Sequence, residues 1–202
     1  MTGIAAYRQS LWESLLVEFV AIGYSLPPRR RRSSVHRLAF GVSYATAMGR
    51  SVMTEWNTLI SAAELQAELG GAQLAIVDCR FDLRDPSAGG RLFPLGHIAG
   101  ASYASLDADL SDLSKTGRGR HPLPDVERFC LALGRMGITP QHQVVAYDGL
   151  DGSIAARFWW MLNLLGHKRV AVLDGGLEAW IRLGGAMTTG SPRVRQREYK
   201  AR

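Results

Sequence analysis

One carboxylate, Asp148, stands where a strand, a glycine-containing loop and an apolar helix follow one another. Residues 144–147 are mostly apolar, Gly149 and Gly152 lie in the loop, and residues 153–165 have the composition of a buried helix. Such a loop aims backbone N–H groups and a helix N-terminus at one point, which stabilises an anion or a thiolate. A carboxylate at that point accepts these N–H groups but cannot act as a sulfur nucleophile. The sequence therefore predicts a filled, inert anion loop, with the alternative that Asp148 faces a partner domain and helps to shape its pocket.

Other charged residues invite a catalytic interpretation but have simpler roles. Asp78 and Arg80 flank the end of a strand, where sites in open α/β sheets gather, and we expect an ion pair that braces the loops. His97 has no identifiable nucleophile beside it, which favours a hydrogen-bonded structural histidine over a general base. Arg157 lies early in the helix after the loop, and we expect a buried arginine paired with a carboxylate, either Asp148 or Asp174.

The chain has only two cysteines, too few for a disulfide framework. Cys130 lies in an apolar helical pattern and is predicted to be a small core residue. Cys79 follows a strand and has no glycine-rich helix start after it, so catalysis by Cys79 is the weakest hypothesis. Cysteine usage predicts a reducing compartment, and we expect the cytoplasm. No Cys/His spacing suggests zinc, no phosphate-loop spacing is present, and we expect no metal or cofactor.

The net charge of +6 is concentrated at the two ends of the 202 residues. Residues 1–52 hold seven arginines against two glutamates, and residues 190–202 hold five basic residues against one glutamate. The segment between them carries 12 basic and 15 acidic residues. A folded part that is mildly acidic argues against a nucleic-acid-binding face.

Three segments follow from this pattern: an extension at 1–52, a domain at 53–189 and a basic linker or tail at 190–202. The apolar stretch at 11–26 is short for a membrane span and contains two glutamates. We expect the extension to be poorly ordered, or the protein to begin at Met53, with organelle targeting or surface attachment to a membrane as the alternative. The tail is too polar for a core element.

Within the domain, short apolar strands alternate with helices. Ser61 and Glu64 have capping-box spacing and open a helix to about residue 69. Residues 82–95 and 107–124 carry Gly, Pro and polar residues and are predicted to be loops. The expected strands are 74–77, 101–104, 144–147 and 170–173, and further helices are expected at 125–136 and 153–165. We expect Trp159, Trp160 and Trp180 to be core anchors. This order predicts an α/β fold with a parallel sheet of about five strands and helices on both faces.

Six short motifs occur in an order that resembles the rhodanese (sulfurtransferase) family. They span about residues 55–187 and read V-D-x-R, GHIxGA, VVxYD, AARxWW, GH and LDGGLxAW. The N-terminal half of tandem thiosulfate and 3-mercaptopyruvate sulfurtransferases is the most similar type, because that half lacks the catalytic cysteine and Asp148 stands at its position here. The resemblance also implies that Arg80, Phe81 and Phe129 line a substrate-binding cleft, although core packing explains the two phenylalanines equally well.

The resemblance implies a chain that supports sulfane-sulfur transfer by a catalytic rhodanese domain but is inactive alone. The alternative is a free-standing rhodanese-like binding or regulatory module. An isolated half would expose the apolar surface that meets its partner, so we also expect self-association. The implied interface or structural residues are Asp78, His97, Asp148 and Arg157.

Overall fold

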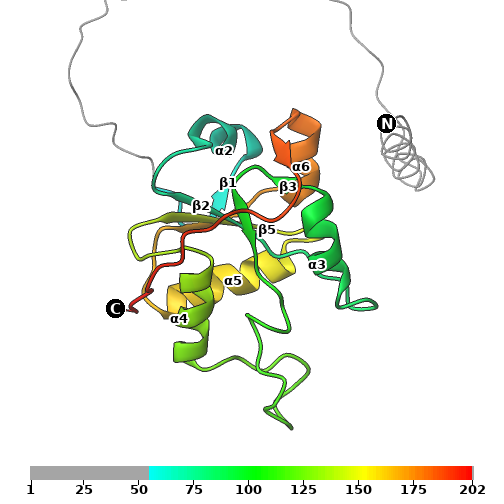
Figure 1. Cartoon of the computed structure of the whole chain (residues 1–202), viewed down its shortest axis with the longest axis vertical. Helices are drawn as coiled ribbons and strands as arrows, with labels where there is room; N and C mark the ends of the chain where they lie inside the picture. Colours follow the sequence, from blue (N-terminus) through cyan, green and yellow to red (C-terminus); the bar gives the residue numbers. More distant parts are fainter. Residues whose placement is uncertain (1–54, 202) are drawn as a thin grey trace, which may run out of the picture. The chain divides into compact units, whose positions relative to one another are not determined.

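The computed structural model describes residues 55–201, so the expectations for residues 1–52 and for a start at Met53 lie outside the described residues. A five-stranded sheet with the order β1-β6-β5-β2-β4 forms the centre of the domain (Figure 1), and all its neighbouring strands are parallel. This confirms the predicted α/β fold with a parallel sheet of about five strands.

The longer strands coincide with the apolar runs that the sequence predicted as strands. The described part of the chain also contains strands of only two residues, which the sequence pattern did not predict. The sheet strands are β1 (Leu59–Ile60), β2 (Leu74–Asp78), β4 (Ala101–Tyr103), β5 (Gln143–Tyr147) and β6 (Val170–Leu173). A separate antiparallel pair joins β3 (His97–Ile98) to β7 (Met187–Thr188). The two-residue strands were missed because so short a segment shows no alternation.

Helices cover both faces of the sheet, as predicted. On one side lie α2 (Ala62–Glu68) and α6 (Gly176–Leu183), and on the other lie α4 (Val126–Arg135) and α5 (Ser153–Leu164). Strand β5 shows why both faces need covering. Val145 and Tyr147 pack with Leu65 of α2 and Trp180 of α6, whereas Val144 and Ala146 belong to the cluster that contains Phe158 of α5. Parallel strands buried on both faces read as continuous apolar runs.

The capping box predicted at Ser61 is present. The hydroxyl of Ser61 accepts a hydrogen bond from the Glu64 backbone N–H at 3.3 Å, and the Glu64 carboxylate accepts one from the Ser61 N–H at 2.9 Å. These two bonds satisfy donors that the first turn of α2 leaves free, which is why the helix begins at this point.

The prediction of a simple loop at 82–95 was wrong. The segment contains the short helix α3 (Ala88–Leu92) and a 3₁₀ turn, Phe93–Leu95. A side chain at Gly89 would lie 2.0 Å from the carbonyl oxygen of Arg80. Gly89, one of the two glycines that suggested a loop, therefore allows this helix to approach the strand end closely.

The expectation that Trp160 anchors the core was also wrong. Its side chain is 44% exposed on α5, whereas Trp180 is fully buried. Trp159 is partly buried and donates a hydrogen bond from its indole nitrogen to the carbonyl oxygen of Asn57 at 2.8 Å.

The polar tail contributes one core residue, contrary to our expectation. Tyr199 is 6% exposed and packs in the cluster on the α4 and α5 side. Its hydroxyl lies 3.0 Å from Nδ1 of His167, and the Arg197 backbone N–H donates to the carbonyl oxygen of Gly134 at 2.9 Å. A Cβ at Gly134 would lie 2.3 Å from the Arg197 carbonyl oxygen, so glycine is needed where the tail crosses α4.

Candidate functional site

The loop between β5 and α5 converges on the carboxylate of Asp148. Its Oδ1 accepts hydrogen bonds from the backbone N–H groups of Leu150 and Gly152, both at 3.0 Å. Its Oδ2 accepts from those of Ile154 and Ala155, both at 3.1 Å. The residue is 2% exposed. The last two donors belong to the first turn of α5, where N–H groups have no helical partner.

This geometry determines what the loop can do. Four donors that would stabilise an anionic reactant already bind a side chain of the chain itself. Gly152 has φ 81°, a left-handed conformation that turns the loop into the helix. The neighbouring carboxylate of Asp151 points elsewhere and accepts a bond from the Ser153 N–H at 3.0 Å, and the hydrogen bonds to Ser153 lower its pKa. The loop is therefore an anion-binding loop whose bound anion is the side chain of Asp148.

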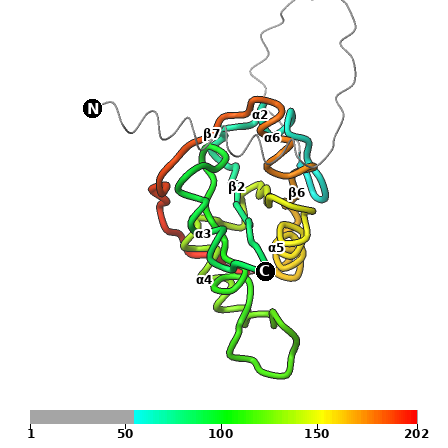
Figure 2. Tube along the Cα trace, turned by 90° about the vertical axis from the view of Figure 1, so that its right-hand side faces the viewer, coloured from blue at the N-terminus to red at the C-terminus, as the bar shows by residue number. Residues whose placement is uncertain are grey.

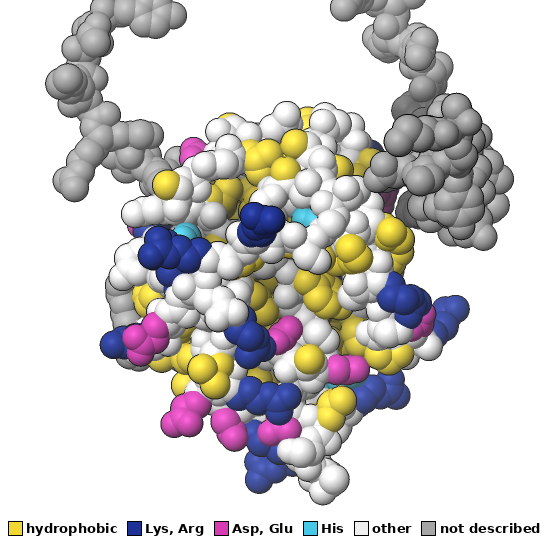
Figure 3. Space-filling view, viewed as in Figure 1, with side chains coloured by type: hydrophobic (Ala, Val, Ile, Leu, Met, Phe, Trp, Pro, Cys, Tyr) yellow, Lys and Arg dark blue, Asp and Glu magenta, His cyan; other side chains and the backbone are white. Residues whose placement is uncertain are grey.

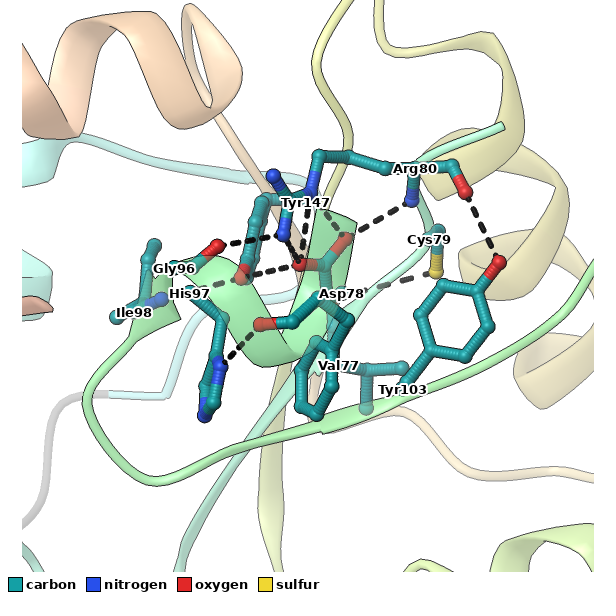
Figure 4. A network of polar contacts seen from close by, with 10 residues as sticks. Val77, Asp78, Cys79, Arg80, Gly96, His97, Ile98, Tyr103 and Tyr147 are labelled. Carbon is teal, nitrogen blue, oxygen red and sulfur yellow. Dashed lines mark hydrogen bonds and ion pairs between the residues drawn. The ribbon is translucent and has the colours of Figure 1, made fainter. Parts of the chain in front are cut away.

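Beside this loop, at the carboxyl end of β2, Asp78 and Arg80 form the expected ion pair (Figure 4). Nη2 of Arg80 lies 2.7 Å from Oδ2 of the fully buried Asp78, and Nε lies within 3.0 Å of both carboxylate oxygens. The same Nη2 donates to the carbonyl oxygen of Gly96 at 2.7 Å. The pair therefore ties the strand end to the segment before β3.

Tyr147 completes the network, a role that the sequence reasoning missed. Its hydroxyl donates to Oδ2 of Asp78 at 2.8 Å and accepts from the backbone N–H of Ile98 at 3.2 Å. Burial, reinforced by the Asp78 charge, raises the pKa of Tyr147 well above its usual range, so the phenol stays protonated. The sequence offered one signal for this role, because Tyr147 directly precedes Asp148 at the end of a strand.

Cys79 is placed unfavourably for nucleophilic chemistry. It is fully buried. Burial, with the charges of nearby carboxylates that include Asp78 and Asp148, raises the pKa of the Cys79 thiol well above its ordinary value. Only a thiolate attacks sulfur efficiently, so this thiol is held in its unreactive form. Cys130 is partly buried against the core, and burial also raises its pKa.

His97 lies on β3 with its ring inside the domain. Nδ1 lies 2.8 Å from the carbonyl oxygen of Phe93, so this nitrogen carries the proton, and the ring stacks on Phe93 with centroids 3.9 Å apart. Among the described residues, Nε2 has no hydrogen-bond partner. The ring is therefore fixed by its backbone contact and by stacking.

Arg157 does not pair with Asp148 or Asp174, and that expectation was wrong. Its Nε and Nη2 donate to the carbonyl oxygen of Leu110 at 3.2 and 2.8 Å, and Nη2 also donates to the carbonyl oxygen of His121 at 2.9 Å. Carbonyl oxygens from a distant loop offered acceptors that spacing along the sequence could not reveal. Burial lowers the pKa of Arg157.

The two aromatic residues proposed to line a cleft occupy different places. Phe81 is 8% exposed at the end of β2 and meets the His121 ring edge to face, with centroids 5.7 Å apart. Phe129 is 2% exposed on α4 and packs edge to face on Phe158. Substrate binding by Arg80, Phe81 and Phe129 stays a prediction, and the structure brings only the first two to the edge of the sheet near Asp148.

Within residues 55–201, no group of three or more His, Cys, Asp or Glu side chains is arranged to hold a metal ion. No helix in this described part is both long and apolar enough to cross a membrane.

Comparisons with known proteins agree with this architecture. The family model of the rhodanese-like domain matches residues 61–183. A probable 3-mercaptopyruvate sulfurtransferase of Pseudomonas aeruginosa is 44% identical over 144 residues, which are 70% of this chain and 51% of that protein. Human 3-mercaptopyruvate sulfurtransferase is 34% identical over 69% of this chain and 47% of its own length.

Among solved structures, 3-mercaptopyruvate sulfurtransferase from Leishmania major superposes with a TM-score of 0.65 at 32% identity. The superposition covers 71% of this chain and 39% of that one. The chain spans about half the length of the curated relatives that it matches.

Proposed function

Because the chain belongs to the rhodanese family, we propose that it is the N-terminal, non-catalytic half of a tandem sulfurtransferase. In this proposal it supports the transfer of sulfane sulfur from thiosulfate or 3-mercaptopyruvate. The reaction itself takes place at a cysteine of a second rhodanese domain. That cysteine thiolate attacks the transferable sulfur of the donor, which breaks the S–S bond of thiosulfate and releases sulfite, or breaks the C–S bond of 3-mercaptopyruvate and releases pyruvate. The resulting persulfide passes its outer sulfur to cyanide or to a thiol acceptor, and the cysteine thiolate leaves.

The observation that carries the proposal is the state of the β5–α5 loop. Asp148 occupies the point where a persulfide would be stabilised, and its two oxygens use the four N–H donors at 3.0–3.1 Å. A carboxylate forms no persulfide, and Cys79 is buried as a protonated thiol. The fold is thus kept while the nucleophile is absent from the loop.

The relatives support the need for a second half. Those named as sulfurtransferases are about twice as long as the matched region. We therefore propose a catalytic rhodanese domain as the partner, supplied on the same polypeptide or by another chain.

We also propose that this half self-associates when its partner is absent. Trp160 and Leu164 lie one turn apart on α5 and are 44% and 61% exposed, and Leu150 is 76% exposed in the loop beside Asp148. Exposed apolar side chains of this size favour association. Sedimentation at increasing concentration checks this, and a monomer at high concentration contradicts it.

A sulfurtransfer assay of the purified chain tests the main proposal, with thiosulfate or 3-mercaptopyruvate as donor and cyanide as acceptor. We expect no activity alone, and activity when a catalytic rhodanese domain is added. Activity of the chain by itself that disappears on Cys79→Ser and Cys130→Ser substitution would overturn the proposal. Failure to form a complex with the added domain would instead favour a free-standing binding module.

A further inference from the structure

The long connection between β4 and α4, residues 107–124, forms an arm rooted near the Asp148 loop. Arg157, in the second turn of α5, holds its two ends through the carbonyl oxygens of Leu110 and His121. Phe81 at the end of β2 contacts the His121 ring. Figures 1 and 2 both show this green segment projecting away from the sheet. The arm therefore starts at the carboxyl edge of the sheet, where open α/β sheets bind ligands.

Three of the four acidic residues of the arm and its junction with α4 pair with Lys or Arg side chains. Asp109 pairs with Arg135 at 2.7 Å, Asp112 with Arg128 at 3.2 Å and Asp125 with Lys115 at 2.6 Å. Oδ1 of the fourth, Asp107, lies 3.4 Å from Nε2 of His121 and forms no hydrogen bond within the described residues. Charges of both signs lie side by side on the lower part of the surface in Figure 3, where the arm lies. These three ion pairs brace the base of the arm against α4 and offset three of its four carboxylates.

Two arginines at the tip of the arm take no part in these ion pairs. Arg118 and Arg120 are exposed, and within the described part of the chain neither guanidinium forms a hydrogen bond or an ion pair. Gly117 and Gly119 precede them with φ values of 73° and 88°, and a Cβ at either glycine would meet nothing within 4 Å. The backbone of the tip is thus unobstructed at both glycines, and within residues 55–201 no carboxylate pairs with either arginine.

We infer that Arg118 and Arg120 bind the anionic sulfur donor where this edge of the domain meets the catalytic half. The inference rests on the proposed function, and it assigns substrate recognition to a half without a nucleophile. A guanidinium matches the planar, paired oxygens of a carboxylate and binds several oxygens of a thiosulfate ion. The ion pairs hold the base of the arm, whereas the exposed side chains of the two arginines at its tip lose rotamer freedom when they bind.

Steady-state kinetics of the chain with an added catalytic rhodanese domain tests this assignment. We expect the Arg118→Ala, Arg120→Ala double variant to raise KM for both donors about 5- to 10-fold, the loss typical of exposed charge-assisted hydrogen bonds. The kcat should not change, because the arm touches no reacting atom. The KM of an Arg118→Lys, Arg120→Lys double variant should lie between that of the native chain and that of the alanine variant, because lysine keeps the charge but lacks the paired donors of arginine. Lys168→Ala, exposed just before β6 at the opposite edge, is the matched control and should leave KM unchanged.

A second measurement needs no activity. Titration of the chain alone with thiosulfate, followed by the arginine Nε–H signals in NMR, should give saturable shifts at Arg118 and Arg120. Sodium chloride at equal ionic strength should not reproduce them.

The outcomes separate the two proposals. An unchanged KM in an active complex overturns the inference and leaves the proposed function standing. An inactive complex overturns the proposed function, and the titration then decides whether the arm binds anions. Saturable shifts support an anion site at Arg118 and Arg120, and the absence of such shifts overturns the inference.

Discussion

Replacing Asp148 with alanine removes the carboxylate that occupies the anion-binding loop between β5 and α5. The substitution removes the acceptor of four backbone N–H groups while leaving the loop backbone unchanged. Water can reach the N–H groups of Leu150, which is exposed, and of Gly152, which is partly exposed. The N–H of the fully buried Ala155 and that of the partly buried Ile154 have no such replacement.

Two buried donors without a partner set the expected cost. Each costs about 1–3 kcal/mol, so the free energy of unfolding should fall by about 2–6 kcal/mol. For a domain of this size that corresponds to a decrease in Tm of about 5–20 °C. Sulfate or thiosulfate should enter the vacated site and restore stability, by about 2.7 kcal/mol at a concentration 100 times its Kd.

Thermal and urea unfolding, with and without sulfate, measure both effects. Asp151→Ala is the matched control, since that carboxylate is exposed and its hydrogen bonds are to Ser153, and it should cost about 1 kcal/mol or less. The reasoning fails if the two variants lose equal stability. It also fails if sulfate stabilises the native protein as strongly as Asp148→Ala.

Three further predictions concern the surroundings of the site. Tyr147→Phe removes the hydroxyl that links Asp78 to β3 and should cost about 1–3 kcal/mol in urea unfolding, with an unchanged midpoint as the contrary result. Burial lowers the pKa of His167 below its ordinary 6.5, so the stability it contributes is complete above that pH and decreases as pH falls towards the folded-state pKa. His167→Gln, which can still accept from Tyr199, should flatten this pH dependence of Tm, and an identical slope in both proteins would contradict it. Finally, Cys79 should react with a thiol reagent only after unfolding, and rapid native-state labelling of it would refute the assigned burial.

Several features could be predicted because they depend on local pattern. The apolar runs at 74–77, 144–147 and 170–173 gave the main strands, and Ser61 with Glu64 gave the start of α2. The ion pair of Asp78 and Arg80 follows from their separation by one residue at a strand end.

Other features depend on what the chain brings together from far apart. Arg157 was expected to find a carboxylate, but carbonyl oxygens 36 and 47 residues away are its acceptors. Trp160 was expected inside, but it lies on the face of α5 that is exposed to solvent. Tyr199 was assigned to a polar tail, yet its side chain enters the core over Gly134. In each case the deciding contact lies outside any window of periodicity.

The sequence by itself determined the class of fold and the carboxylate at the end of β5, because hydrophobic periodicity and the identity of residue 148 are local properties. Only the tertiary structure decided that the Asp148 carboxylate takes all four N–H donors, since those donors converge only when α5 packs on β5. The structure also decided which charges remain free. Ion pairs engage Asp109, Asp112 and Asp125 of the arm and its junction with α4, and Arg118 and Arg120 are left facing solvent.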